Sequence, residues 1–161
     1  MSYSFETYYL IHFPILEPVV SLKELYEESR TLFWAIAITS CRHQSQHFGL
    51  YNRLCDPFRS LLSNLLITTV QRLKDLQALL LICQWPLDAE TGTEDPSWML
   101  VGFVMNAALH MGLDKNDDEV LFGYRRAKYS LQFYDVRCRR RTWIQIFQIS
   151  TQYELASLMT A

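Results

Sequence analysis

Apolar residues recur at intervals of three and four along most of this chain, and this spacing constrains the fold more than any other feature of the sequence. The spacing places apolar side chains on one face of an α-helix, whereas a half-buried strand would alternate apolar and polar positions. The 161 residues include only five glycines and five prolines, which argues against an all-β protein built on many tight turns. The sequence therefore predicts an all-α fold, an irregular array of several helices.

Two helices are predicted in the first part of the chain. The first covers residues 21–41 and begins with Ser21 and Glu24, which have the spacing of a capping box, where each side chain accepts a hydrogen bond from the other residue's backbone N–H. The second covers residues 50–66. A break and restart are predicted inside it at Pro57, because the preceding aspartate is a good helix cap and proline fits a first turn.

Three more helices are predicted further along. One covers residues 69–84, and its nearly continuous apolar run at 76–82 indicates burial on more than one side. Another begins at 95–98 and ends before Gly112, a residue type that commonly follows the last helical turn. The last helix begins near Phe133. For the helix that begins at 95–98, the spacing predicts that one face is lined by Trp98, Val101, Gly102, Met105, Ala108 and Leu109.

The length suits one domain, and a chain of this size can bury about two thirds of its unfolded surface. We expect a single helical domain over residues 1–161. No glycine, proline or asparagine follows Tyr153 to end the last helix. The sequence therefore predicts that the chain is truncated at its C-terminal end and forms an incomplete part of a larger helical domain.

One set of residues has the types that bind zinc. Cys41, His43, His47 and Cys55 follow one another as Cys-x-His-x₃-His-x₇-Cys, and zinc takes such ligands tetrahedrally. Structural zinc sites usually pair their ligands closely at both ends, and the isolated Cys55 argues against this set. The alternative is a buried Cys41 at a helix end, followed by two loop histidines that face water.

No phosphate-binding glycine loop, nucleophile elbow or zinc-protease motif occurs in the sequence, and we expect no catalysis. The acidic segment 114–119 begins like a calcium loop, but Glu119 stands where such a loop requires glycine and Arg125 where it requires its final glutamate. His110 has apolar neighbours, which favours a hydrogen-bonded packing residue over a catalytic base. The alternative of a small all-helical enzyme would use His110 or the acids of residues 117–119.

Charge and hydropathy exclude several classes of protein. The formal net charge is −2, so the chain is not a globally basic nucleic-acid binder. The stretch nearest to a membrane span, residues 96–113, holds proline, asparagine, histidine and two glycines, which are poorly suited to a bilayer. The first ten residues lack the basic and apolar regions of a secretory signal. The four widely separated cysteines are expected to be small buried hydrophobes.

A basic run at 137–141, followed by Trp143, has the composition of a nucleic-acid contact. Five consecutive helical positions, however, point around the whole helix rather than along one stripe. We therefore expect some of these arginines to face the protein, where guanidinium groups pair with carboxylates or helix C-termini. No direct DNA contact is expected from this segment.

Four motifs in the same order resemble the middle homology region of fungal zinc-cluster transcription factors. They are the apolar segment 76–86, Asp95–Trp98, Asn106–Leu113 and Arg139–Trp143, and residues 9–18 also resemble the start of that region. The resemblance implies structural roles for the residues that match the family motifs, namely Gln77, Trp98, His110, Gly112, Leu113, Arg139, Arg140, Arg141 and Trp143.

Two departures from the family pattern change what the resemblance implies. Asp114 stands where the family usually has a histidine after Gly-Leu, which puts any role of that histidine in doubt. The family's factors also carry a six-cysteine zinc cluster that reads DNA, and four scattered cysteines cannot form it. No cofactor is therefore expected in this chain, since zinc would belong to the absent cluster.

The resemblance implies a non-catalytic regulatory module of a fungal transcription factor, which modulates DNA-templated transcription in the nucleus. The expected partners are the transcription machinery or a regulatory protein, with a small-molecule effector as a further ligand and no membrane contact. A third interpretation is a stand-alone helical interaction protein that forms a homodimer, because apolar stripes left uncovered on the last helix would drive association.

Overall fold

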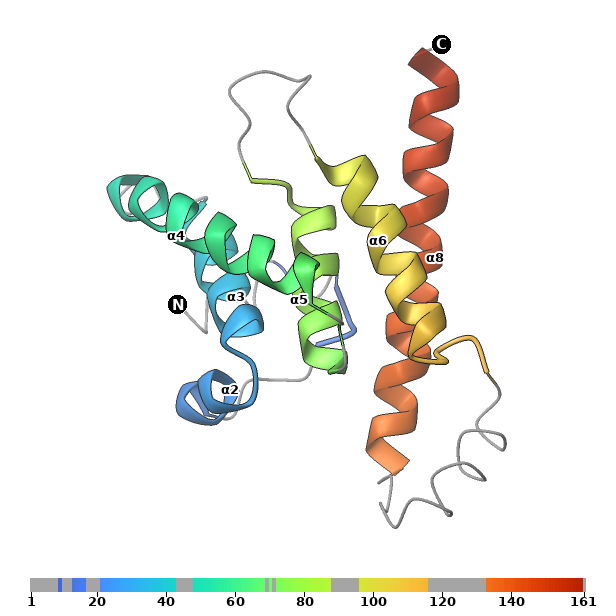
Figure 1. Ribbon diagram of the computed structural model, residues 1–161, viewed down its shortest axis with the longest axis horizontal. Coiled ribbons are helices and arrows are strands. Elements are labelled where there is room, and N and C mark those ends of the chain that lie inside the picture. Colours follow the sequence, from blue (N-terminus) through green and yellow to red (C-terminus); the bar gives the residue numbers. More distant parts are fainter. Residues whose placement is uncertain are drawn as a thin grey trace.

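The computed structural model describes residues 9, 13–16, 21–42, 48–68, 70, 72–87, 96–115 and 133–160. These residues form six helices and no strand, and the all-α prediction is confirmed. The helices are α2 (Leu22–Glu28), α3 (Arg30–Arg42), α4 (Phe48–Ile67), α5 (Leu73–Gln84), α6 (Ser97–His110) and α8 (Phe133–Thr160) (Figure 1). None of the helices in the described residues is long and apolar enough to cross a membrane.

Helix α5 lies at the centre of the molecule, with α3 on one side and α6 and α8 on the other (Figure 1). Every residue from Asp75 to Cys83 is buried, and Leu79 is 0% exposed. A helix enclosed in this way needs apolar side chains all around it, rather than along one stripe. The predicted burial of this segment on more than one side is confirmed.

The N-terminal residues close one end of α5. The rings of Tyr9 and Phe13 pack edge-on against Trp85, with ring centroids 5.0 and 5.5 Å apart. The Tyr9 hydroxyl also donates a hydrogen bond to the Thr39 carbonyl (2.9 Å). Burial raises the pKa of Tyr9 and so further favours the protonated hydroxyl that donates this hydrogen bond. These contacts join the start of the chain to α3 and to the end of α5.

The helix predicted over residues 21–41 is interrupted at Ser29, so the expectation of one helix is wrong. Its start is as predicted, because the Ser21 hydroxyl accepts a hydrogen bond from the Glu24 N–H (3.3 Å). Ser29 has extended backbone angles and ends α2. Its hydroxyl then accepts a hydrogen bond from the Leu32 N–H (3.0 Å) and caps the start of α3.

Helix α4 continues through Pro57, so the predicted break at this residue is wrong. Tyr51, Cys55, Phe58 and Leu62 are all buried, and their spacing places them on one face of a single helix. This face packs on both sides of the proline, and α4 contacts α3. The packing of one continuous stripe outweighs the single backbone hydrogen bond that proline removes.

Helix α6 buries only part of the predicted face: Val101 and Ala108 are in the core, together with residues outside that face. Trp98 is 52% exposed and Leu109 is 45% exposed, although both belong to the predicted face. Because α6 carries apolar residues on nearly every side, their spacing cannot select a face. The positions of α5 and α8 select it instead, and the buried apolar residues are Leu100, Val101, Val104 and Ala108.

The C-terminal end of α6 follows the predicted glycine. Gly112 has a φ of 67°, a conformation that side chains with a Cβ rarely adopt. Its N–H donates to the Leu109 carbonyl (2.9 Å), and the Leu113 N–H donates to the Ala108 carbonyl (3.0 Å). This pair of hydrogen bonds is a Schellman motif. Helix α8 begins at Phe133, as predicted, and runs antiparallel beside α6 (Figure 1).

Candidate functional site

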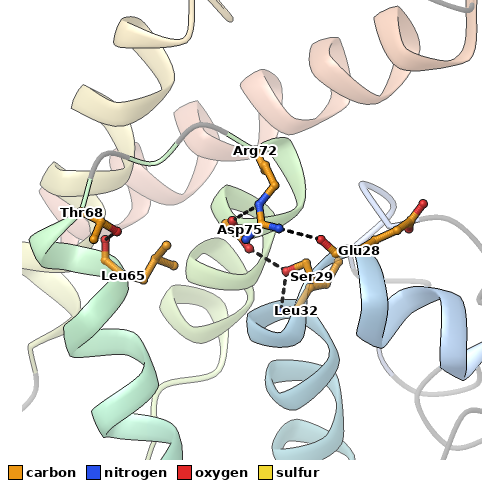
Figure 2. Close-up of polar contacts among 7 residues, drawn as sticks. All are labelled: Glu28, Ser29, Leu32, Leu65, Thr68, Arg72 and Asp75. Atoms are coloured by element: carbon orange, nitrogen blue, oxygen red, sulfur yellow. Dashed lines mark hydrogen bonds and ion pairs between the residues drawn. The ribbon is translucent and has the colours of Figure 1, made fainter.

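A polar cluster around the buried Asp75 carboxylate links the break between α2 and α3 to the start of α5, and Figure 2 shows its side chains. The Asp75 side chain is 4% exposed. It accepts hydrogen bonds from the Ser29 hydroxyl (2.7 Å) and from Arg72 Nε (2.8 Å). The Arg72 guanidinium also donates to the Glu28 carbonyl (3.0 Å) at the end of α2. We call these four residues the Asp75 joint.

The Asp75 joint offsets the cost of burying a carboxylate. An ionised group removed from water needs both charge compensation and hydrogen bonds. Arg72 supplies the opposite charge, and Ser29 supplies a hydroxyl donor. Lys74 and Glu28 form an ion pair beside the joint. Sequence reasoning missed this cluster, although an aspartate at the start of an apolar helix, three residues after an arginine, was a signal for it.

A second buried joint lies at Gln77, one of the residues that match the family motifs. Gln77 is 5% exposed, and its Nε2 atom donates to the Ile15 carbonyl and to the Thr142 hydroxyl, both at 3.1 Å. Thr142 on α8 is 0% exposed. The hydroxyl of Tyr153, about three helical turns further along α8, donates to the Cys83 carbonyl of α5 (3.0 Å). These contacts fix α8 against α5.

Some arginines of the basic run on α8 contact other parts of the protein, and others point into solvent. Arg139 donates to the carbonyls of Met111 (3.0 Å) and Gly112 (3.3 Å), at the C-terminal end of α6. A guanidinium is favourable there, because the last carbonyls of a helix carry its partial negative charge. Arg141 lies 3.5 Å from the Pro14 carbonyl, and Arg140 is exposed. Helix geometry thus points the arginines in several directions.

Two other residues of the family motifs lie at the surface, which corrects what the sequence suggested for them. His110 is exposed in the last turn of α6, so the expectation of a packing residue among apolar neighbours is wrong. Trp98 is exposed in the first turn of α6. The buried face of α6 is turned away from both positions. Leu113 is 6% exposed, and Trp143 is partly buried against the core.

The structure describes two of the four residues that were considered as zinc ligands. Cys41 and Cys55 are buried in the core, in α3 and α4 respectively, while His43 and His47 lie outside the described residues. Burial raises the pKa of the Cys41 thiol and favours its neutral form, whereas zinc binds the thiolate. Within the part of the chain that is described, no group of three or more His, Cys, Asp or Glu side chains could hold a metal ion.

In the described residues, the buried polar side-chain atoms form hydrogen bonds within the protein. Among those residues, every buried side-chain nitrogen or oxygen has a hydrogen-bond partner. The joints described above account for the most deeply buried polar groups on α5. The arrangement is therefore suited to hold helices in fixed positions. The acids of residues 117–119, proposed for an enzyme, lie outside the described residues.

The surface of α8 carries large apolar side chains, as expected if the last helix has an uncovered stripe. Ile144 is 57% exposed, Phe147 62%, Leu155 56% and Leu158 75%. Isolated exposed apolar residues are normal on protein surfaces, but a contiguous group commonly marks an interaction site. This group is the strongest candidate for an interaction surface among the described residues of α8.

Comparison with known proteins gives the class of the chain. A family described as "Fungal specific transcription factor domain" matches residues 4–155. The chain therefore belongs to this family, and it is the middle homology region that its sequence motifs resemble. No solved structure matches it.

The similar curated proteins are transcription regulators by name. Putative transcription factor SEF1 of Eremothecium gossypii is 32% identical over 140 residues, which cover 86% of this chain and 13% of that protein. Transcriptional regulatory protein SEF1 of Candida albicans is 31% identical over 139 residues, covering 84% of this chain and 15% of that protein. Regulatory protein LEU3 of Saccharomyces cerevisiae is 28% identical over 155 residues, covering 87% and 17% respectively. The chain thus spans less than a fifth of the length of these relatives.

Proposed function

We propose that this chain is a non-catalytic regulatory module of a nuclear transcription factor. It acts through contacts with the transcription machinery, a regulatory protein or a small-molecule effector. The family match over residues 4–155 carries the proposal. The names of the relatives, which are those of transcription regulators, support it. DNA recognition, and any zinc that it requires, is assigned to sequence outside this module.

The arrangement of polar and apolar groups is compatible with this role. The Asp75 joint and Gln77 use their buried polar atoms to connect helices. Apolar side chains of α6 and α8 lie at the surface, where a partner protein can reach them. A module of this kind transmits an effect through its folded shape and surface, so its activity depends on an intact core.

A reporter experiment tests the proposal. The chain is fused to an unrelated DNA-binding domain in a fungal host, and a reporter gene with the matching operator is measured. We expect the fusion to raise or lower reporter expression relative to the DNA-binding domain alone. Leu79→Asp, which buries a charge in α5, is expected to abolish the effect because it disrupts the fold. Asn64→Asp, at an exposed position of α4, serves as the matched control.

The contradicting result is a reporter output that is the same for the fusion, the Leu79→Asp variant and the DNA-binding domain alone. Immunoblots of all the fusions separate loss of function from loss of protein. An effect that survives Leu79→Asp at equal abundance would also overturn the proposal, because it would come from an unfolded segment and not from the helical module.

A further inference from the structure

The break between α2 and α3 is one residue long, and the local sequence does not require it. Residues 22–42 contain neither glycine nor proline, the two residue types that most often interrupt a helix. Four buried residues of this segment follow one another at intervals of four, three and four, which places them on one face of a continuous helix. They are Leu25, Ser29, Leu32 and Ile36. The segment is therefore compatible with an unbroken helix as well as with the observed break.

The backbone groups at the break show which hydrogen bond an unbroken helix would form. In such a helix the Leu32 N–H would donate to the Glu28 carbonyl, four residues earlier. In the structure these two groups are separated, and each has another partner. The Leu32 N–H donates to the Ser29 hydroxyl (3.0 Å). The Glu28 carbonyl accepts a hydrogen bond from Arg72 (3.0 Å).

Both of these substitute partners belong to the Asp75 joint. The Asp75 carboxylate accepts one hydrogen bond from Ser29 and another from Arg72, and it holds the two side chains in place (Figure 2). The joint thus supplies the two hydrogen bonds that replace the helical one. Because Asp75 is 46 residues from Ser29 in the sequence, the break depends on tertiary contacts with the start of α5.

Little of α2 is buried in the core. Leu25 is its one buried residue. On the exposed side the Arg30 guanidinium lies over the Tyr26 ring, 5.4 Å from its centroid. This contact does not need the break, because residues four apart are also neighbours on an unbroken helix. Aligning α2 with α3 would therefore open the joint and uncover Leu25 while the rest of the core stays in place.

We propose that residues 22–42 are a two-state element and that the Asp75 joint sets its state. With the joint closed, Ser29 is extended, and α2 and α3 have different axes on its two sides (Figure 2). With the joint open, Ser29 is helical and α2 continues α3 as a single helix. The Arg72 side chain is 64% exposed and that of Asp75 is 4% exposed. Arg72 is therefore the part of this conformational device that can be reached from solvent, and a change there shifts the balance between the two states.

Nuclear magnetic resonance of the purified 161-residue chain tests the two states, because the ¹³Cα chemical shift of residue 29 differs between extended and helical backbone. Ser29→Ala removes the hydroxyl that bonds to Asp75 and caps α3, and alanine has the highest helix propensity. We expect the ratio of continuous to broken helix to rise by a factor of about ten, the order expected for a lost helix cap. The chemical shift of residue 29 then moves toward the helical value.

The matched control is Ser40→Ala, the same substitution at another buried serine of α3. The Ser40 hydroxyl donates within its own helix, to the Ile36 carbonyl (2.6 Å). Its removal does not touch the joint, so residue 29 is expected to stay extended.

Arg30→Pro tests the proposal from the opposite direction. Proline fits the first turn of α3 and favours an extended residue before it, so it is compatible with the broken form. It prevents the continuous helix, because its nitrogen has no hydrogen to donate to the Tyr26 carbonyl. The double variant Ser29→Ala/Arg30→Pro is therefore expected to return residue 29 to the extended conformation.

A folded Ser29→Ala chain in which residue 29 stays extended would overturn the proposal. If Ser29→Ala does not fold, the wild-type chain decides. Relaxation dispersion detects a minor state that exchanges on the microsecond-to-millisecond timescale. We expect it at residues 29–32 of the wild-type chain and not in Arg30→Pro. Its absence from the wild-type chain, or its persistence in Arg30→Pro, would overturn the two-state element. The inference rests on the joint alone, so its outcome is independent of the reporter experiment.

Discussion

The central helix α5 and an exposed stripe of α8 are both mainly apolar, and their surroundings differ. We call this stripe the outer stripe of α8, and it consists of Ile144, Phe147, Thr151, Leu155 and Leu158. Leu79 on α5 is 0% exposed, and Leu158 on α8 is 75% exposed. The core requires apolar residues on all sides of α5, because α3, α6 and α8 contact it. On α8, apolar residues are required only on the one face that packs against the core. The same kind of side chain thus stabilises the fold in one region and is available for association in the other.

Polar contacts sharpen the difference between these two regions. The side chains of Asp75 and Gln77 are buried on α5 and bonded to other segments of the chain. On the outer stripe of α8, Thr151 is exposed and donates to the Phe147 carbonyl of its own helix (2.9 Å). Polar groups on α5 therefore position neighbouring elements, while those on the outer stripe serve α8 itself.

The largest expected difference comes from the same truncation in the two regions. Leu79→Ala is expected to lower the free energy of unfolding by about 2–5 kcal/mol, because it removes apolar contacts and leaves a cavity. Leu158→Ala is expected to change it by about 0.5 kcal/mol or less, because the side chain is mostly in water. Urea unfolding, followed by circular dichroism, measures both. Equal losses would show that the last turns of α8 belong to the core.

A smaller difference is expected between two carboxylates. Asp75→Ala leaves the Ser29 hydroxyl and Arg72 Nε without the acceptor they share and is expected to cost about 1–3 kcal/mol of unfolding free energy. Glu154→Ala, on exposed α8, is expected to cost about 0.5 kcal/mol or less. The variant Asp75→Asn retains one acceptor oxygen and is expected to lie between them. The expectation is wrong if Asp75→Ala unfolds at the same urea concentration as the wild-type chain.

The boundary between the two regions is tested by a double-mutant cycle on Gln77 and Thr142. Their hydrogen bond joins α5 to the inner face of α8. We expect Gln77→Leu and Thr142→Val to be coupled by about 0.5–1.5 kcal/mol, the net value of one buried hydrogen bond. The control pair is Gln77→Leu with Thr151→Val on the outer stripe, for which we expect additivity. Additive effects for Gln77 and Thr142 would mean that α8 is not fixed by this contact.

Cap chemistry explains which helix ends were predictable. Ser21 and Gly112 act within one turn of their own helix, so their roles can be deduced from local sequence. Ser29 also caps a helix, but its hydroxyl donates to Asp75, which is 46 residues away. Nothing near Ser29 in the sequence specifies that partner. The break between α2 and α3 was therefore missed.

Local sequence also predicts only in part which face of a helix is buried. The uniform apolar run of α5 predicted its enclosure, because few other environments accept such a run. The apolar residues of α6 surround the helix, and the predicted face is buried at Val101 and Ala108 but exposed at Trp98 and Leu109. Among the matched family residues, Gln77 and Arg139 have partners that are distant in sequence. Their motif identified them as a group, and the structure supplied what each one contacts.

The sequence by itself determined the all-α class, the approximate extent of most helices, the caps at Ser21 and Gly112, and membership of the transcription factor family. These properties depend on residues close together in the chain or on motifs that can be recognised in order. Only the tertiary structure decided the break at Ser29, the continuity of α4 through Pro57, the buried face of α6 and the buried and exposed faces of α8. Each of these depends on packing between distant segments, and local spacing does not encode which segments meet.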